Sequence, residues 1–505
     1  MSRNRTILIT AGVMLSLFMA AMESTVVSTA MPTIVADLGG LSIYSWVFSA
    51  YLLTSTTTMP LYGKLSDIYG RRPIFMIALA LFLGGSVLSG QAGSMEQLIL
   101  FRALQGLGAG GLQPLAFILI GDMFSFEQRA KMQGLFSGVW GISSIVGPLL
   151  GGFLVDQVSW HWVFYVNIVP GILAGAIIWF LWVEHAHVAQ NKRAAIDYAG
   201  AAVLTLDVVV LLFGLFEFGT LLGSGLLVLA ALFLFGLIWI ERRAADPILP
   251  MSLFGDRLFS IALIQGVLAG CALFGSASFV PLFVQAVLGT SATLAGATLT
   301  PQLLGWVGAS IIGSRLLLRM GYHRIAIVGM VILTIGAALM ARIDANSNLI
   351  GIMVNVSIMG IGMGLSIPAF LLAVQNTVPR RLLGTATSTV QFSRSIGGAI
   401  GVSIMGIVLA ARLTAGLIAA GMNPDSIDLD SLLNPVPGAN IAVEGALRIA
   451  LANAVQSVFV VALIAAVLGL VATTLTPRGH IAHLIADRKE TEAGGQAPAE
   501  SGLFE

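Results

Sequence analysis

Few ionisable residues lie inside the long apolar stretches of this sequence, where a charge is expensive. Glu23 stands in the stretch MESTVVSTAMP, after Ile7 to Ala21 have passed without one charged residue, and Arg102 and Asp207 stand in comparable runs. Charged side chains within membrane-spanning segments are rare and by default indicate a functional site. These three residues are therefore the first candidates for chemistry.

A carboxylate at membrane depth is suited to proton exchange, because desolvation favours its protonated form and an approaching cation favours its charged form. Glu23 is thus a candidate for exchanging a proton against a cationic compound, and Asp207 for a second proton or substrate-charge site. Structural alternatives stay open: Glu23 could be paired permanently with an arginine, and Asp207 could hold its helix against a neighbour. Thr25 and Thr29 could line the same cavity or bond back to their own helix.

The composition places these residues in a membrane protein. Of 505 residues, 57% are hydrophobic and 10% are charged, and the mean hydropathy is +0.94. Soluble domains carry about 25% charged residues. The net charge of +1 argues against nucleic-acid binding, and one cysteine, Cys271, excludes an internal disulfide framework.

Apolar runs of about 20 residues are long enough to cross the hydrocarbon core as helices. The first is too long for the apolar core of a secretory signal. The sequence predicts fourteen such spans, at 7–30, 44–62, 73–92, 97–120, 134–155, 162–183, 198–217, 220–240, 258–284, 292–314, 325–343, 349–375, 384–411 and 452–475.

Basic residues support this division. Of the 25 Lys and Arg residues, twenty fall in alternate loops or at the two ends, three fall in the opposite loops, and Arg102 and Arg394 lie within spans. Cytoplasmic loops carry an excess of Lys and Arg. We therefore expect both termini to be cytoplasmic, in the inner (plasma) membrane of a prokaryotic cell.

Similar loops recur in the two halves of the chain. GKLSDIYGRRP at 63–73 corresponds to GSRLLLRMGYHR at 313–324, and Arg129 precedes Gly147 by the same 18 residues that separate Arg380 from Gly398. Repeated halves around a central site are a transporter architecture. The expected fold is all-α and integral to the membrane: a six-helix bundle at 1–190, two inserted helices at 191–256, a pseudo-symmetric six-helix bundle at 257–478, and a polar cytoplasmic tail at 479–505.

Several motifs resemble those of the major facilitator superfamily. GKLSDIYGRRP resembles its signature loop, LILFRALQGLGAG its fourth-helix motif, and GVWGISSIVGPLLGG the fifth-helix motif of its antiporters. MESTVVSTAMPTI and QFSRSIGGAIGV resemble first- and thirteenth-helix patterns of the fourteen-helix drug:proton antiporter branch. The sequence departs from the family in having Glu where that branch often has Asp, and in lacking the Asp in the second copy of the loop.

The resemblance implies roles for particular residues. It implies that Arg102 assists proton transfer beside Glu23, with a structural clamp as the alternative. It also implies that one loop is a conformational latch rather than a substrate site; the residues of this latch are Gly63, Asp67, Gly70, Arg71 and Arg72.

Other residues are candidates for the substrate cavity or for helix bending. Arg394, Gln391 and Phe283 are cavity candidates together with Glu23, and Arg394 could face either Glu23 or Asp207. The antiporter-helix motif would let helices approach closely and bend; its residues are Gly138, Gly141, Gly147, Pro148, Gly151 and Gly152.

The sequence therefore predicts a secondary transporter that exchanges lipophilic, often cationic compounds for protons. The chain has no P-loop, so we expect the proton gradient and no cofactor to drive it, and we expect no metal site. The expected partners are small lipophilic substrates, protons and membrane lipid, with no nucleic acid, and the chain is expected to be a monomer. Export of an endogenous lipid or metabolite is the alternative; a membrane-embedded enzyme or receptor is disfavoured, because no reactive cluster or extramembrane domain is present.

Overall fold

The computed structural model describes residues 3–40, 43, 46–183, 197–244, 246–290, 292–422 and 445–477. Within these ranges every regular element is helical and no strand occurs. The predicted tail at 479–505 lies outside the described residues. A chain surrounded by lipid must satisfy its backbone hydrogen bonds internally, and continuous helices do so.

Fourteen helices of fourteen residues or more follow one another along the described chain. They are α1 (Arg3–Leu38), α2 (Trp46–Tyr69), α3 (Arg71–Ser89), α4 (Met95–Met123), α5 (Phe126–Gln157), α7 (Ile168–Leu181), α8 (Tyr198–Phe216), α9 (Leu221–Glu241), α11 (Arg257–Leu282), α13 (Thr300–Met320), α14 (Tyr322–Met340), α15 (Leu349–Thr377), α16 (Leu383–Ala419) and α18 (Gly445–Thr474).

Short elements join some of these helices. They are α6 (Trp162–Tyr165), α10 (Met251–Phe254), the π-helix η3 (Phe283–Val287), α12 (Ala292–Ala297) and the 3-10 helix η4 (Arg380–Leu382). The predicted sixth span is accordingly split into α6 and α7, and the predicted ninth span ends in η3. The observed α1 and α16 are longer than predicted, because the residues that flank their apolar runs continue the helix.

Twelve of the described helices are long and apolar enough to span a membrane. The other two long helices, α2 and α13, contain 24 and 21 residues. The run of hydroxyl residues at 55–58 makes α2 more polar, and Arg315 and Arg319 do the same for α13. The fold is therefore consistent with fourteen spans.

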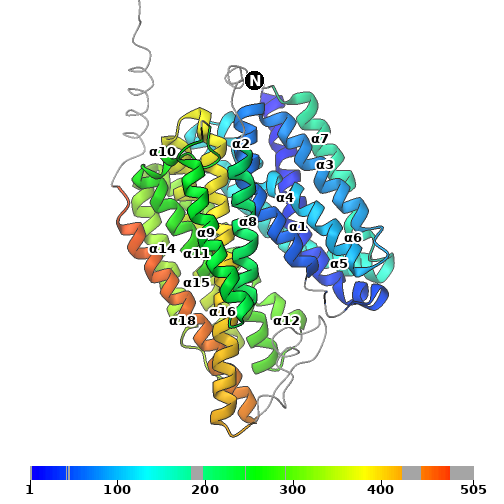
Figure 1. The fold of residues 1–505 in the computed structure, drawn as a ribbon, viewed down its shortest axis with the longest axis vertical. Helices are drawn as coiled ribbons and strands as arrows, with labels where there is room; N and C mark the ends of the chain where they lie inside the picture. Colours follow the sequence, from blue (N-terminus) through cyan, green and yellow to red (C-terminus); the bar gives the residue numbers. More distant parts are fainter. Residues whose placement is uncertain are drawn as a thin grey trace, which may run out of the picture.

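The long helices pack into two groups of six (Figure 1). The first group contains α1 to α5 and α7, and the second contains α11, α13 to α16 and α18. The inserted helices α8 and α9 pack against each other, and α8 also contacts α2 of the first group and α16 of the second. The exact boundaries predicted for the four segments of the chain stay predictions.

The two groups approach each other at one end and diverge at the other (Figure 1). We call the end that holds Arg3 and Gly70 the closed end and the opposite end the splayed end. Hydrogen bonds between the groups lie in the closed half, between Asp67 and α16, Gln375 and Phe117, Ser137 and Ser310, and Ser395 and Met59. In the described part of the chain, the closed end is thus where the halves are joined.

Candidate functional site

Glu23 and Arg102 form an ion pair inside the first group of helices. Arg102 Nη1 on α4 donates to Glu23 Oε1 on α1 at 2.6 Å. Glu23 is 1% exposed and Arg102 is 0% exposed. A buried charge of this kind is tolerated only when it is paired and hydrogen-bonded. The structure therefore brings together the two residues that the sequence singled out independently.

The ion pair belongs to a closed ring of five buried side chains. Arg102 Nη1 also donates to Gln105 Oε1 at 2.6 Å, and Gln105 Nε2 donates to Ser86 Oγ at 3.0 Å. Asn167 Nδ2 lies 3.0 Å from the same hydroxyl oxygen and donates to Glu23 Oε2 at 2.6 Å. Each carboxylate oxygen of Glu23 therefore has its own donor.

Four helix segments position this ring in the splayed half of the molecule. Arg102 is near the start of α4, Ser86 is near the end of α3, and Asn167 is the residue that precedes α7. Because α3 and α4 run in opposite directions, the end of one meets the start of the other. The ring therefore lies away from the closed end.

Two groups from α2 complete the surroundings of Arg102. Its Nε donates to the backbone oxygen of Val47 at 3.3 Å, and its guanidinium carbon lies 4.2 Å from the centre of the Tyr51 ring. A guanidinium over an aromatic face gains cation–π attraction. Arg102 thus ties α2 to α1, and protonation of Glu23 would remove the charge that holds this arrangement together.

The sequence did not single out Ser86, Gln105 or Asn167. A signal was available for Gln105, because it follows Arg102 by three residues and such pairs share a helix face. Ser86 and Asn167 carry no comparable local signal, since Asn167 meets Glu23 only through the packing of α7 on α1, and Ser86 joins the ring only through the packing of α3 on α4 and α7.

Asp207 is buried in α8, where its neighbours Leu204 and Val208 belong to an apolar cluster with Ile396 of α16. No hydrogen bond or ion pair joins Asp207 to another described residue. The structure thus keeps Asp207 apart from the Glu23 ring. Its assignment as a second proton site stays a prediction.

The remaining cavity candidates lie in the second group. Arg394 on α16 is half-buried and pairs with neither Glu23 nor Asp207. Gln391, one turn before it, is buried. Phe283 is 1% exposed and lies in the apolar core of the second group, at the start of η3.

The predicted latch connects the two groups at the closed end. Asp67 Oδ1 accepts from the backbone N–H of Gly384 at 3.0 Å, and Asp67 Oδ2 accepts from that of Thr385 at 2.7 Å. These amides lie in the first turn of α16, where a helix offers unpaired N–H groups and a favourable dipole. Arg71 holds the same carboxylate at 2.6 Å and reaches Asp122 on α4 at 2.8 Å.

The other latch residues have different surroundings. A Cβ atom at Gly63 would lie 1.9 Å from Ser388 Oγ and 2.6 Å from Gly384 O, so only glycine allows α2 and α16 to approach this closely. Gly70 has a φ of 97° at the reversal between α2 and α3. Arg72 lies over the ring of Trp179 on α7, within the first group.

The glycines of the antiporter-helix motif divide into two sets. A Cβ at Gly147 or Gly151 would meet Thr25 Oγ1 or Thr29 Oγ1 of α1 at 2.0 and 2.1 Å, and one at Gly141 would meet Val307 of α13 at 2.9 Å. Pro148 lies inside α5 between these contacts. Gly138 and Gly152 have no such neighbour. The close packing of α5 on α1 therefore extends past Glu23, from Phe18 to Thr29.

Thr25 and Thr29 bond back to their own helix. The Thr25 hydroxyl donates to Met22 O at 2.8 Å, and the Thr29 hydroxyl donates to Val26 O at 2.7 Å. The sequence left open whether these hydroxyls line a cavity or bond back to their own helix, and the structure shows that they form the bonds within the helix.

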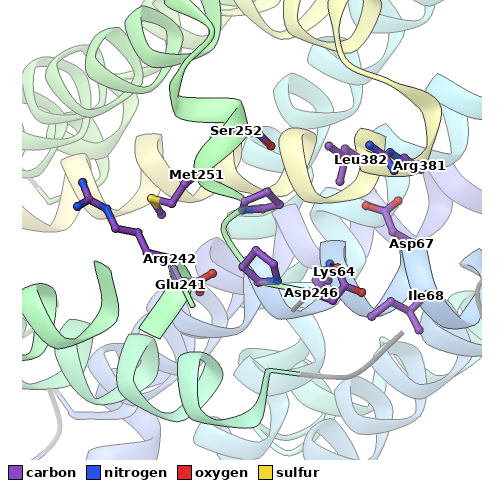
Figure 2. A pocket seen from close by; sticks show the side chains of 12 residues that line it. Lys64, Asp67, Ile68, Glu241, Arg242, Asp246, Met251, Ser252, Arg381 and Leu382 are labelled. Atoms are coloured by element: carbon purple, nitrogen blue, oxygen red, sulfur yellow. Dashed lines mark hydrogen bonds and ion pairs between the residues drawn. The ribbon is translucent and has the colours of Figure 1, made fainter. Parts of the chain in front are cut away.

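A cavity of about 420 Å³ lies at the closed end (Figure 2). Its walls come from the end of α2, the connection from α9 to α10, and η4; they include Lys64, Glu241 and Arg381. Lys64 forms an ion pair with Asp246 of that connection. The cavity therefore lies where the inserted pair joins the latch, at the opposite end of α2 from the Glu23 ring. Among the described residues, no cluster of His, Cys, Asp and Glu is suited to a metal ion.

Comparisons with known proteins agree with this architecture. A family model described as Major Facilitator Superfamily matches residues 13–402. The chain is 37% identical to the multidrug transporter protein MdtP of Bacillus subtilis (strain 168), over 81% of this chain and 76% of that protein. It is 36% identical to multidrug resistance protein 3 of the same strain, over 79% of this chain and 78% of that protein.

A further relative and two solved structures are also similar to this chain. Efflux pump dotC of Dothistroma septosporum is 32% identical over 77% of this chain and 68% of its own. The proton:xylose symporter XylE superposes with a TM-score of 0.65 at 12% identity, covering 93% of this chain and 95% of its own. Human MFSD10, an organic anion transporter, superposes with a TM-score of 0.62 at 14% identity, covering 94% of this chain and 100% of its own. The matched family model, the multidrug relatives and the helical fold together establish that this chain belongs to the Major Facilitator Superfamily of membrane transporters.

Proposed function

We propose that this protein expels lipophilic, often cationic compounds in exchange for protons. The observation that carries the proposal is the buried ring around Glu23, in which a membrane-depth carboxylate is paired with Arg102 and Asn167. Multidrug transport by relatives that are 36–37% identical supports the substrate class. The driving force would be the proton gradient, without a cofactor.

The proposed mechanism couples the charge of Glu23 to the arrangement of helices. In the charged form both oxygens of Glu23 accept hydrogen bonds, from α4 and from the residue before α7. A proton on either oxygen makes that oxygen a donor with less acceptor capacity and removes the negative charge, so the contact to that oxygen weakens. Loading and release of a proton would thus change how α1 is held by its neighbours.

A packed path leads from α1 toward the second group of helices. Thr25 and Thr29 contact the glycines of α5, and α5 in turn meets α13 at Gly141 and through the hydrogen bond of Ser137 to Ser310 at 2.8 Å. A shift of α1 would therefore displace α5 and change its contacts with α13, which join the two groups. We propose alternating access, in which the Asp67 latch opens when these contacts change.

The setting of the protein is part of the same proposal. We place it in the plasma membrane of a prokaryotic cell as a monomer, with the closed end and both termini in the cytoplasm. Partners would be small substrates, protons and lipid, without nucleic acid. An endogenous lipid or metabolite is the alternative substrate, whereas catalysis or receptor function has no supporting cluster among the described residues.

The test uses purified protein in proteoliposomes with an imposed pH gradient. Ethidium movement and proton release are followed together for the wild type, Glu23→Gln, and Glu217→Gln as a control at the end of α8. We expect Glu23→Gln to abolish both signals and the control to retain them. If wild-type protein moves no lipophilic cation, the drug assignment is wrong; if coupling survives Glu23→Gln, the proton role passes to Asp207.

A further inference from the structure

Arg394 is a charged residue within a membrane-spanning helix, and its side chain has no partner among the described residues. It is twelve residues into α16 and half-buried, and its side chain makes no ion pair or hydrogen bond with another described residue. The guanidinium group carries five N–H donors and stays charged in proteins. A group of this kind at membrane depth normally has a partner.

Gln391 lies one helical turn before Arg394 and has an unused donor. Its side chain is 1% exposed, and its Nε2 atom is buried without a hydrogen-bond acceptor. A buried donor without an acceptor is unfavourable, because it has lost water and gained nothing in return. Two neighbouring side chains on α16 thus lack acceptors.

Both side chains belong to the face of α16 that carries Thr387. Residues three and four apart share a helix face, so Gln391 and Arg394 continue the face that starts at Thr387. The Thr387 hydroxyl lies 3.3 Å from Gln375 Nε2 on α15, and this amide also reaches the backbone oxygen of Phe117 on α4 at 3.4 Å. The unpaired donors therefore lie between this contact and Ser395, whose hydroxyl donates to Met59 Sδ on α2 at 3.8 Å.

No acidic residue of the described chain neutralises Arg394. Glu23 is already bound to Arg102 and Asn167. Asp207 belongs to α8, which packs on the face of α16 that carries Ile396. The side chain of Arg394 is therefore an uncompensated positive charge among the described residues, which favours an anionic acceptor beside it.

We propose that Arg394 and Gln391 bind a carboxylate group of the transported compound. A carboxylate can accept two parallel N–H bonds from a guanidinium group, and the amide of Gln391 can donate a third. This inference rests on the proposed function, in that the space between the groups holds substrate. It adds that lipophilic acids and zwitterions are substrates and that their acidic end is bound by α16.

Two probes with the same apolar body and opposite charges test this assignment. Equilibrium binding of pyrenebutyrate and pyrenebutylamine is measured with purified full-length protein in nanodiscs, without a pH gradient. The variants are Arg394→Gln and Gln391→Leu. The matched control is Arg412→Gln, which changes an exposed arginine on the same helix.

We expect the wild type to bind the carboxylate probe, Arg394→Gln to weaken that binding about tenfold or more, and Gln391→Leu to weaken it less. Binding of the amine should stay within twofold of wild type, which also shows that the variants are folded, and the control should bind both probes normally. The proposal is overturned if wild type does not bind the carboxylate, or if Arg394→Gln affects both probes equally. Because the binding measurement uses no pH gradient, either of these results would contradict carboxylate binding without testing proton coupling.

Discussion

The carboxylate of Asp67 accepts hydrogen bonds from the backbone N–H groups of Gly384 and Thr385, which follow it by 317 and 318 residues in the chain. One acidic side chain at the end of α2 thus caps the first turn of α16 and joins the two halves of the transporter. Arg71 holds this carboxylate from the side and links it to Asp122.

Replacing Asp67 by Asn should loosen the closed end. The amide keeps one acceptor oxygen but loses the charge that faces Arg71 and the start of α16. We expect transport to fall about tenfold, in line with loss of one or two charge-assisted hydrogen bonds. A cysteine at position 388, in a protein whose buried Cys271 is replaced by Ala, should react faster with a hydrophilic maleimide. The control is Asp344→Asn, in an exposed loop at the splayed end; equal labelling of all three proteins would contradict the latch.

Replacing Gly63 by Val should prevent the closed end from forming. Its Cβ would lie 1.9 Å from Ser388 Oγ and 2.6 Å from a backbone oxygen, so α2 and α16 would have to separate. We expect efflux to be lost, because one of the two states of the proposed alternating access becomes inaccessible. Gly84→Val on α3 is the matched control, since no neighbouring atom lies within 4 Å of its Cβ. Normal efflux by Gly63→Val would show that this close approach is dispensable.

Replacing Arg102 alone should destabilise the protein more than replacing Arg102 and Glu23 together. Arg102→Met leaves a buried carboxylate without its cation, which costs about 3–5 kcal/mol. Glu23→Gln together with Arg102→Met removes both charges and should recover part of this loss. Denaturant unfolding in micelles gives the free energy of unfolding for both single variants and the double variant. Additive effects would indicate that the two residues do not interact.

Asn167→Leu should change the pH dependence of transport. The amide of Asn167 donates to Glu23 Oε2 and so stabilises the charged carboxylate. The variant removes this donor, while Arg102 and the nearby Tyr51 remain. The proton is therefore retained to higher pH, and the pH of half-maximal efflux should rise by about one unit.

The matched control is Asn376→Leu on α15. This amide is also buried, but it donates to the backbone oxygen of Leu372 rather than to an acid. We expect its pH profile to equal that of wild type. The same shift in both variants would mean that loss of any buried amide has this effect, and the specific role of Asn167 would then be wrong.

The sequence alone determined the local features of this protein. Apolar runs of sufficient length indicated the helices, because lipid requires continuous hydrogen-bonded backbone. Glu23 and Arg102 were recognisable as candidates since a charge in such a run is costly wherever it points. Glycines and acids at loop positions indicated the latch, through motifs that resemble those of a known family.

Only the tertiary structure decided which of these residues meet. Glu23 and Arg102 are 79 residues apart and Glu23 and Asn167 are 144 apart, so their contact depends on how α1, α4 and α7 pack. The same packing leaves Arg394 without the acidic partner that the sequence allowed. Hydrogen bonds and ion pairs act over about 3–4 Å, so the partner of each side chain depends on distance in space. Spacing along the chain does not indicate which residues far apart in the sequence come this close.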